Sequence, residues 1–144
     1  MAISKTVLMG WKVVVIDDEP DSLEVATRIL RYYGSAVTTA QNGMEGIERI
    51  REVRPRFVIC DLSMPELDGW GVITILKMDD TLRDIPVIAL TAHALLEDRT
   101  RAIAAGFHNY LTKPLTAATF MGELLNLLID IPGFDMLRTE SGTP

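Results

Sequence analysis

The sequence has little of what a disulfide-bonded, exported or membrane-spanning protein needs. Its 144 residues include one cysteine, Cys60, so no disulfide can form within the chain and a reducing compartment fits best. The first ten residues carry one basic residue and a brief apolar patch, too short for a signal-peptide core. No apolar run approaches the roughly 18 residues that a membrane helix requires. These absences predict a cytoplasmic protein.

Basic residues are also in deficit. Lys and Arg number 14 against 20 Asp and Glu, which gives a formal net charge of −6 at pH 7. Because a negative surface repels phosphate backbones and anionic headgroups, we expect neither a nucleic-acid nor a membrane partner. Hydrophobic residues make up 48% and charged residues 24%, as in an ordinary folded domain. The length predicts one such domain.

Five short apolar runs alternate with amphipathic stretches along the chain. The runs occupy residues 13–16, 35–40, 57–60, 87–90 and 107–111. Three of them are apolar almost without alternation, which is typical of strands covered on both faces. Between them, apolar residues recur at helical spacing. This order predicts an α/β fold with a doubly wound five-stranded parallel sheet and helices on both faces.

Start and stop signals agree with this alternation. Pro20 and Asn42 stand where two helices should begin, and Gly34 and Gly106 stand where two should end. The last helix is expected at 116–130. After residue 130 the composition shifts toward turn-forming residues, so we expect an N-terminal extension at 1–11, a domain at 12–130 and a flexible tail at 131–144.

Reactive side chains follow four of the five expected strands. Asp17 and Asp18 follow the first strand, Asp61 the third, Thr91 the fourth and Lys113 the fifth. Because parallel strands end at one edge of the sheet, these groups should converge there. Three carboxylates and one ammonium leave a charge of −2, which matches one hard divalent cation such as Mg²⁺ or Mn²⁺. The cluster therefore predicts phosphate chemistry.

Four motifs in this order and spacing resemble the receiver domain of two-component response regulators. They read VIDDEP at 15–20, CDLSMPELDG at 60–69, LTA at 90–92 and YLTKP at 110–114. The resemblance covers about residues 12–130. It implies a flavodoxin-like strand order of 2-1-3-4-5 and, because no effector domain follows, a stand-alone receiver like the chemotaxis regulators.

The resemblance also implies how the site works. Asp61 would be the phosphoacceptor, which takes a phosphoryl group from a histidine kinase or a histidine phosphotransfer protein. Asp18, Asp61 and the backbone carbonyl of Ser63 would hold Mg²⁺, and Asp17 would act through a water molecule or help to position the ion. Lys113 would pair with the phosphoryl oxygens.

A switch is implied beside this site. Thr91 and Ala92 would bind the new phosphoryl group, and Tyr110 would then change its rotamer. This would remodel the face made by the helix that Gly106 ends, the strand at 107–111 and the last helix. An effector protein, or a second copy of the chain in a homodimer, would read that face.

Two further expectations rest on the same resemblance. The Lys113–Pro114 bond is a candidate cis peptide. Ser63 and His93 lie two residues beyond Asp61 and Thr91, and the hypothesis is that they tune the lifetime of the phosphoryl group.

Three alternatives remain open. A receiver-like adaptor that works without phosphorylation would not need the intact acidic cluster. A Mg-dependent aspartyl-phosphate phosphatase typically has a second Asp two residues after its nucleophile, and Ser63 holds that position here. A flavin carrier needs a first loop that accepts phosphate, which Asp17, Asp18 and Glu19 would repel. The favoured interpretation is a phosphoacceptor that is not an enzyme acting on other molecules.

Overall fold

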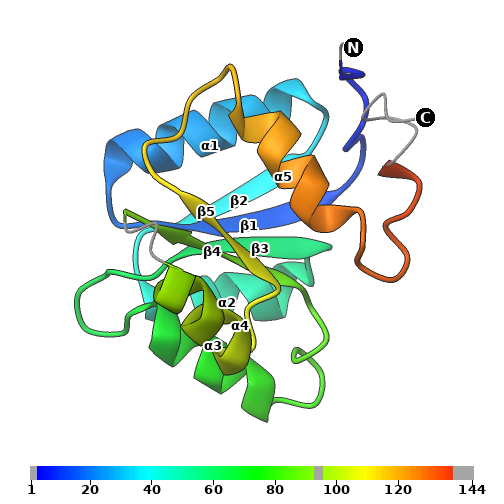
Figure 1. Ribbon diagram of the computed structural model, residues 1–144. Helices are drawn as coiled ribbons and strands as arrows, with labels where there is room; N and C mark the ends of the chain where they lie inside the picture. Colours follow the sequence, from blue (N-terminus) through cyan, green and yellow to red (C-terminus); the bar gives the residue numbers. More distant parts are fainter. Residues whose placement is uncertain (1–2, 93–95, 138–144) are drawn as a thin grey trace.

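A computed structural model describes residues 3–92 and 96–137 as one α/β unit (Figure 1). Its strands are β1 Lys12–Ile16, β2 Ala36–Ala40, β3 Phe57–Asp61, β4 Val87–Thr91 and β5 Asn109–Thr112. Its helices are α1 Pro20–Tyr32, α2 Gly43–Val53, α3 Gly69–Met78, α4 Leu96–Ala105 and α5 Phe120–Leu128. The predicted alternation of strands and helices is confirmed.

The five strands form one parallel sheet in the order β2-β1-β3-β4-β5, as predicted. Helices α1 and α5 cover one face, and α2, α3 and α4 cover the other (Figure 1). Successive residues of a strand point to opposite faces of the sheet. The central strands therefore contribute side chains to two hydrophobic cores, one on each face. In β1, Val13 and Val15 pack beneath α1 and α5, whereas Val14 and Ile16 pack toward α2 and α3.

Local sequence signals place the helix ends. Pro20 is the first residue of α1. Proline suits this position because the N–H groups of a first helical turn have no partner within the helix, so the N–H that proline lacks costs no hydrogen bond. Asn42 caps α2 by accepting a hydrogen bond from Glu45 N at 2.9 Å. Gly34 and Gly106 follow α1 and α4 with φ of 100° and 117°, a left-handed conformation that costs glycine least.

The last strand and the last helix differ from the sequence prediction by more than one residue. The fifth strand begins at Asn109, because Phe107 turns inward and its ring lies against Trp70 at 5.8 Å. The last helix begins at Phe120 and ends at Leu128. Residues 116–119 form a turn in which the hydroxyls of Thr116 and Thr119 lie 2.7 Å apart.

The first half of the expected tail at 131–144 packs against the core. Ile131, Phe134 and Leu137 are buried in the same core as α1 and α5, although this segment forms mostly turns. The N-terminal extension packs there too, since Leu8 is buried and Trp11 lies edge-on to Phe134 at 4.9 Å. Residues 138–144 lie outside the described part of the chain.

The two terminal segments meet at the edge where the strands begin. Both chain ends lie on this side of the molecule (Figure 1). The carboxyl ends of all five strands lie at the opposite edge. In the described ranges, no helix has the length and apolar character needed to cross a bilayer.

Candidate functional site

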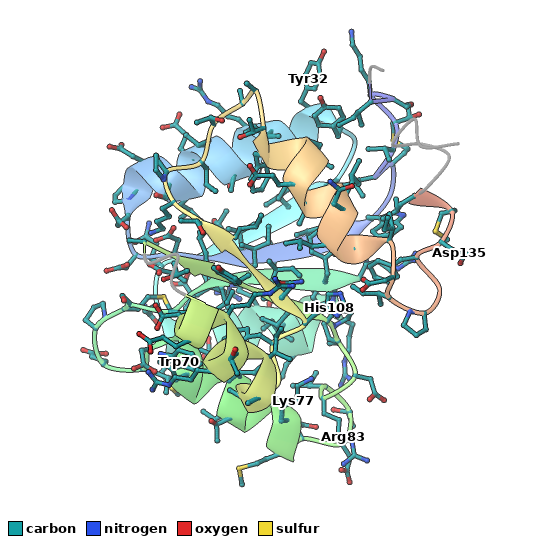
Figure 2. All side chains as sticks on the ribbon, in the orientation of Figure 1. Tyr32, Trp70, Lys77, Arg83, His108 and Asp135 are labelled. Atoms are coloured by element: carbon teal, nitrogen blue, oxygen red, sulfur yellow. The ribbon has the colours of Figure 1, made fainter. Side chains whose placement is uncertain are left out.

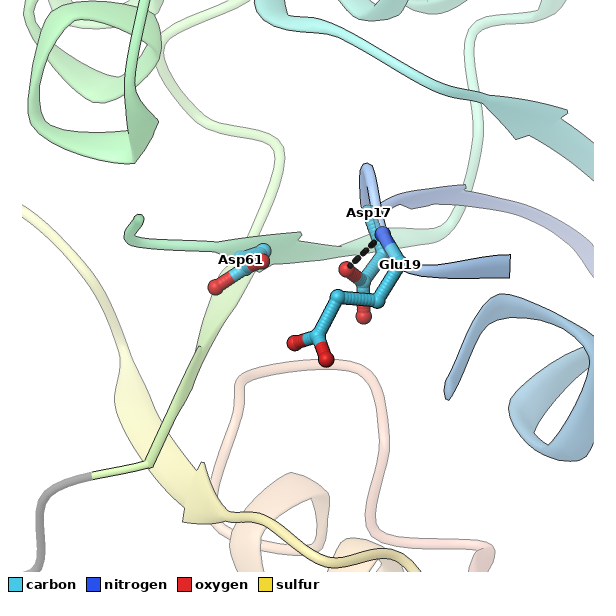
Figure 3. A group of neighbouring side chains, drawn as sticks. All are labelled: Asp17, Glu19 and Asp61. Carbon is cyan, nitrogen blue, oxygen red and sulfur yellow. Dashed lines mark hydrogen bonds between the residues drawn. The ribbon is translucent and has the colours of Figure 1, made fainter. Parts of the chain in front are cut away.

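The carboxyl edge of the sheet brings three acidic side chains together (Figure 3). Asp17 directly follows β1 and is fully buried, and Asp61 is the last residue of β3 with only 3% of its surface exposed. Glu19 stands at the N-cap of α1, and its carboxylate reaches back toward both. Because β1 and β3 are neighbours in a parallel sheet, their ends place these residues side by side.

Lys113, which follows β5, supplies the cation at this cluster. Its Nζ lies 3.3 Å from Asp61 Oδ2 and 3.2 Å from Asp17 Oδ2, and it donates a hydrogen bond to Asp17 Oδ1 at 3.3 Å. It also forms a close ion pair with Glu19 Oε1. The predicted convergence of Asp17, Asp61 and Lys113 is therefore present in the structure.

Backbone groups hold the carboxylates in place. Ser63 N donates to Asp61 Oδ1 at 3.1 Å, and Glu19 N donates to Asp17 Oδ1 at 3.0 Å. Lys113 N donates to Thr91 O at 2.7 Å, which extends the pairing of β4 with β5 to the lysine. These bonds fix the side chains before any ligand arrives.

A close backbone approach shapes the loop after Asp61. A Cβ atom on Gly69 would lie 2.4 Å from the Asp61 carbonyl oxygen, so no larger residue fits there without moving the strand end. Asp68 caps α3 by accepting a hydrogen bond from Gly71 N at 2.9 Å. The start of α3 is thus held close to the end of β3.

The environment shifts the pKa values of the two central groups. Burial raises the pKa of Asp61 to about 7, and Asp17 adds to the rise, while the Ser63 N–H and Lys113 oppose it. Burial alone would lower the pKa of Lys113, but the hydrogen bond to Glu19 and the charges of Asp17 and Asp61 raise it overall. Lys113 is therefore held in its charged form.

The residues present fit a divalent cation. One carboxylate oxygen from each of Asp17, Glu19 and Asp61 lies within 4.8 Å of the other two. Two buried oxygens, Asp17 Oδ2 and Asp18 Oδ1, have no hydrogen-bond partner, although Lys113 faces Asp17 Oδ2. Carboxylate oxygens are the ligands that Mg²⁺ and Mn²⁺ prefer.

Glu19 is the member of this cluster that the sequence analysis did not assign. It belongs to the acidic run after the first strand, but its role depends on a side-chain direction that spacing does not fix. Asp18, which was expected to bind metal, is half-buried and lies outside the group formed by Asp17, Glu19 and Asp61.

Comparison with known proteins agrees with this site and fold. The family model described as the response regulator receiver domain matches residues 13–125. The chain belongs to the response-regulator receiver family.

Two relatives illustrate the range of this receiver family. The transcriptional regulatory protein PrrA of Mycobacterium leprae is 38% identical over 117 residues, which cover 81% of this chain and 49% of PrrA. The chain thus spans about half the length of that relative. The polar-differentiation response regulator DivK of Brucella anthropi is 32% identical over 122 residues, which cover 85% of this chain and 99% of DivK.

A solved structure adds a metal to the comparison. The receiver domain of the sensor histidine kinase PA1611 from Pseudomonas aeruginosa matches with a TM-score of 0.71 and 28% identity. The match covers 93% of this chain and 99% of that one, whose active-site cleft holds a coordinated magnesium ion.

Thr91 and Ala92 lie at the same edge of the sheet as the cluster. Thr91, the last residue of β4, is buried beside it, and Ala92 follows on the surface. The Lys113–Pro114 peptide bond is cis. His93 lies outside the described residues.

Tyr110 lies on the face of the receiver domain that was expected to switch. It is half-buried on β5 and packs against the core beneath α3 and α4. It also lines a shallow cavity of about 470 Å³ together with Arg99 of α4 and Glu123 and Leu127 of α5. The fourth and fifth helices and the fifth strand therefore form one continuous hollowed surface.

Trp70 ties two helices together next to the site (Figure 2). It stands in the first turn of α3, just after the loop that carries Asp61. The guanidinium of Arg101 on α4 lies 4.1 Å from its ring centroid, a cation–π distance. This contact joins the start of α3, just after the loop that follows Asp61, to α4.

Proposed function

We propose that this receiver domain accepts a phosphoryl group on Asp61 from the phosphohistidine of a histidine kinase or a histidine phosphotransfer protein. The observation that carries the proposal is the setting of the Asp61 carboxylate. It is buried at the end of β3, yet its Oδ2 lies 3.3 Å from Lys113 Nζ. A carboxylate fixed beside a cation at a sheet edge is suited to attack an anionic phosphoryl group.

The transfer exchanges one bond to phosphorus for another. An Asp61 carboxylate oxygen forms the new P–O bond while the P–N bond to the donor histidine breaks. The electron pair of the P–N bond returns to the ring nitrogen, the released imidazole takes up a proton, and the product is an acyl phosphate. Asp61 attacks in its ionised form, and Lys113 supplies positive charge to the phosphoryl oxygens.

Mg²⁺, or Mn²⁺ in its place, is the cofactor of this proposal. Asp18, Asp61 and the backbone carbonyl of Ser63 would hold it, with Asp17 acting through a water molecule. The unpartnered buried oxygens of Asp17 and Asp18 support this assignment. When bound, the ion neutralises charge on the phosphoryl oxygens.

The output of the domain would be a binding event. Thr91 and Ala92 would contact the new phosphoryl group, and Tyr110 would respond on the adjacent strand. The register supports this chain of contacts, since Asp61 pairs with Leu90 and Thr91 pairs with Thr112. An effector protein, or a second copy of the chain, would then recognise the surface of α4, β5 and α5.

Ser63 and His93 would set the lifetime of the phosphoryl group. The exposed side chain of Ser63, beside the carboxylate that its N–H contacts, supports this role for Ser63. The chain would catalyse only its own phosphorylation and dephosphorylation, in the cytoplasm. Unchanged dephosphorylation rates in Ser63→Ala and His93→Ala would contradict the lifetime role.

Beryllofluoride binding tests the proposed phosphoacceptor. Beryllofluoride mimics a phosphoryl group on a carboxylate, so it should bind the wild-type domain only when Mg²⁺ is present and should not bind Asp61→Asn. Fluorine NMR detects the bound form directly. If the wild-type domain forms no complex, the phosphoacceptor role is wrong and an adaptor that works without phosphorylation becomes the better account.

A further inference from the structure

Lys113 has three acceptors and no spare donor in the unmodified domain. An ammonium group carries three N–H bonds. Three carboxylates face the Lys113 Nζ: Asp17 and Asp61 at 3.3 Å and Glu19 in closer contact. While Asp61 is still ionised, an incoming phosphoryl oxygen can therefore bind Lys113 only when one of these carboxylates gives up its place. Once Asp61 is modified, the phosphoryl oxygens share Lys113 with Asp17 and Glu19.

The three carboxylates differ in the free energy that it costs to separate each from Lys113. The side chains of Asp17 and Asp61 are 0% and 4% exposed, so before the transfer either one, if released, would be left as a poorly compensated buried charge. The Glu19 side chain is 62% exposed, so water can replace the ammonium as its partner. Glu19 is therefore the partner that leaves at least cost.

The backbone lets the Glu19 side chain move without disturbing the site. Its N–H is held by Asp17 Oδ1 at 3.0 Å, and Pro20 follows it as the first residue of α1. The main chain is thus fixed on both sides of Glu19. Among the described residues, the exposed Glu19 carboxylate is bound by the Lys113 side chain and by no backbone N–H. Exchange at Lys113 requires only a side-chain rotation.

We propose that Glu19 is a positioning residue that holds Lys113 in the unmodified domain and competes with the phosphoryl group for it. This inference rests on the proposed function, because it concerns the same transfer to Asp61. Glu19 acts through Lys113 and not on the phosphoryl group itself. It therefore slows phosphorylation and weakens the phosphorylated state.

Glu19→Gln removes the competing charge while keeping the side chain's shape. We expect beryllofluoride affinity and the rate of phosphorylation by a small acyl phosphate to rise about threefold to tenfold. The matched control is Glu24→Gln, which makes the same charge change on α1 at an exposed residue paired with Arg28. This control should stay within experimental error of the wild type.

A double variant separates action through Lys113 from a general effect of charge. In a Lys113→Met background, Glu19→Gln should no longer change the phosphorylation rate, because the lysine for which it competes is gone. An increase of the same size in that background would overturn the proposal. So would an unchanged beryllofluoride affinity in Glu19→Gln when the wild-type domain binds the analogue.

A second readout uses the unmodified protein and does not depend on phosphorylation. Losing the Glu19 carboxylate removes one of the negative charges that hold Lys113 as an ammonium. More of the neutral amine, which is the form that attacks acetic anhydride, is then present, so acetylation of Lys113 should be at least about threefold faster in Glu19→Gln than in the wild type or Glu24→Gln. Peptide mass mapping measures this rate. An unchanged rate overturns the proposal even if no analogue binds, which distinguishes its failure from that of the phosphoacceptor role.

Discussion

Asp61 shows how function and stability conflict at the scale of one residue. Its carboxylate is buried beside Asp17, and this raises its pKa to about 7, compared with about 4 in an unfolded chain. The folded state therefore binds a proton on Asp61 more tightly than the unfolded state does. Above pH 7 the ionised form opposes folding, and this cost fades as the pH falls toward 4.

Asp61→Asn should therefore stabilise the metal-free domain. With a chelator present, we expect the free energy of unfolding to rise by about 2 kcal/mol at pH 8, because Lys113 keeps Asp17 and Glu19 as partners. The gain should shrink toward pH 5, where the wild-type carboxyl is protonated. Urea unfolding between pH 5 and pH 8 measures this, with the exposed Asp135→Asn as control. A loss of stability at pH 8 would contradict the account.

Glu66 carries backbone strain in the loop after Asp61. Its φ is 65°, in the left-handed region that disfavours residues with a side chain. Glu66→Gly should raise the free energy of unfolding by about 1 kcal/mol, as urea unfolding would show. The same substitution at Glu48, an exposed position inside α2, should lower it by about 1 kcal/mol. If both substitutions changed the free energy of unfolding in the same direction, the result would argue against strain at Glu66.

The sequence predicted residues at strand ends better than residues on loops. Asp17, Asp61 and Lys113 follow apolar strands, and the geometry of a parallel sheet brings such residues together whatever their rotamers. Glu19 was missed because its contact with Lys113 depends on the direction of a long side chain at a helix N-cap. Neither spacing nor residue type determines that direction.

At the scale of elements, the terminal segments extend the core beyond the part that the family model matches. Trp11 and Phe134 pack edge to face at 4.9 Å, and the guanidinium of Arg56 lies 4.0 Å from the Trp11 ring centroid. The sequence predicted a flexible segment here because its composition shifts toward turn-forming residues after residue 130. Three buried side chains, Ile131, Phe134 and Leu137, nevertheless hold it to the core.

Phe134→Ala should cost stability without changing the chemistry. We expect a loss of about 3 kcal/mol in the free energy of unfolding, because the substitution leaves a cavity beside Trp11. Phosphorylation rates should stay unchanged, since this cluster lies at the opposite edge of the sheet from Asp61. Met136→Ala, at a half-exposed neighbouring side chain, is the control and should be near neutral. Thermal unfolding measures the stability of both variants, and phosphorylation assays measure their rates. A Phe134→Ala protein as stable as the wild type would show that the segment does not anchor the fold.

At the scale of the whole molecule, the candidate site and the terminal segments lie at opposite edges of one sheet. The side chains of Asp17, Asp61 and Lys113 lie at the carboxyl edge. The two terminal segments lie at the opposite edge (Figure 1). Asp135 lies on that opposite side, away from Trp70 beside the site (Figure 2). The sequence predicted this architecture because alternating strands and helices with fully apolar strands admit few arrangements. The exact ends of β5 and α5 were missed, since tertiary contacts of Phe107 and the turn at 116–119 decide them.

The central claim is that Asp61 accepts a phosphoryl group in a metal-dependent reaction, and intact mass spectrometry tests it most directly. The domain is incubated with Mg²⁺ and a small acyl phosphate, alongside Asp61→Asn and a sample with a chelator. The account predicts one added phosphoryl group on the wild-type protein and none in either control. An adduct of the same mass on Asp61→Asn would place the modification on another residue and contradict the account.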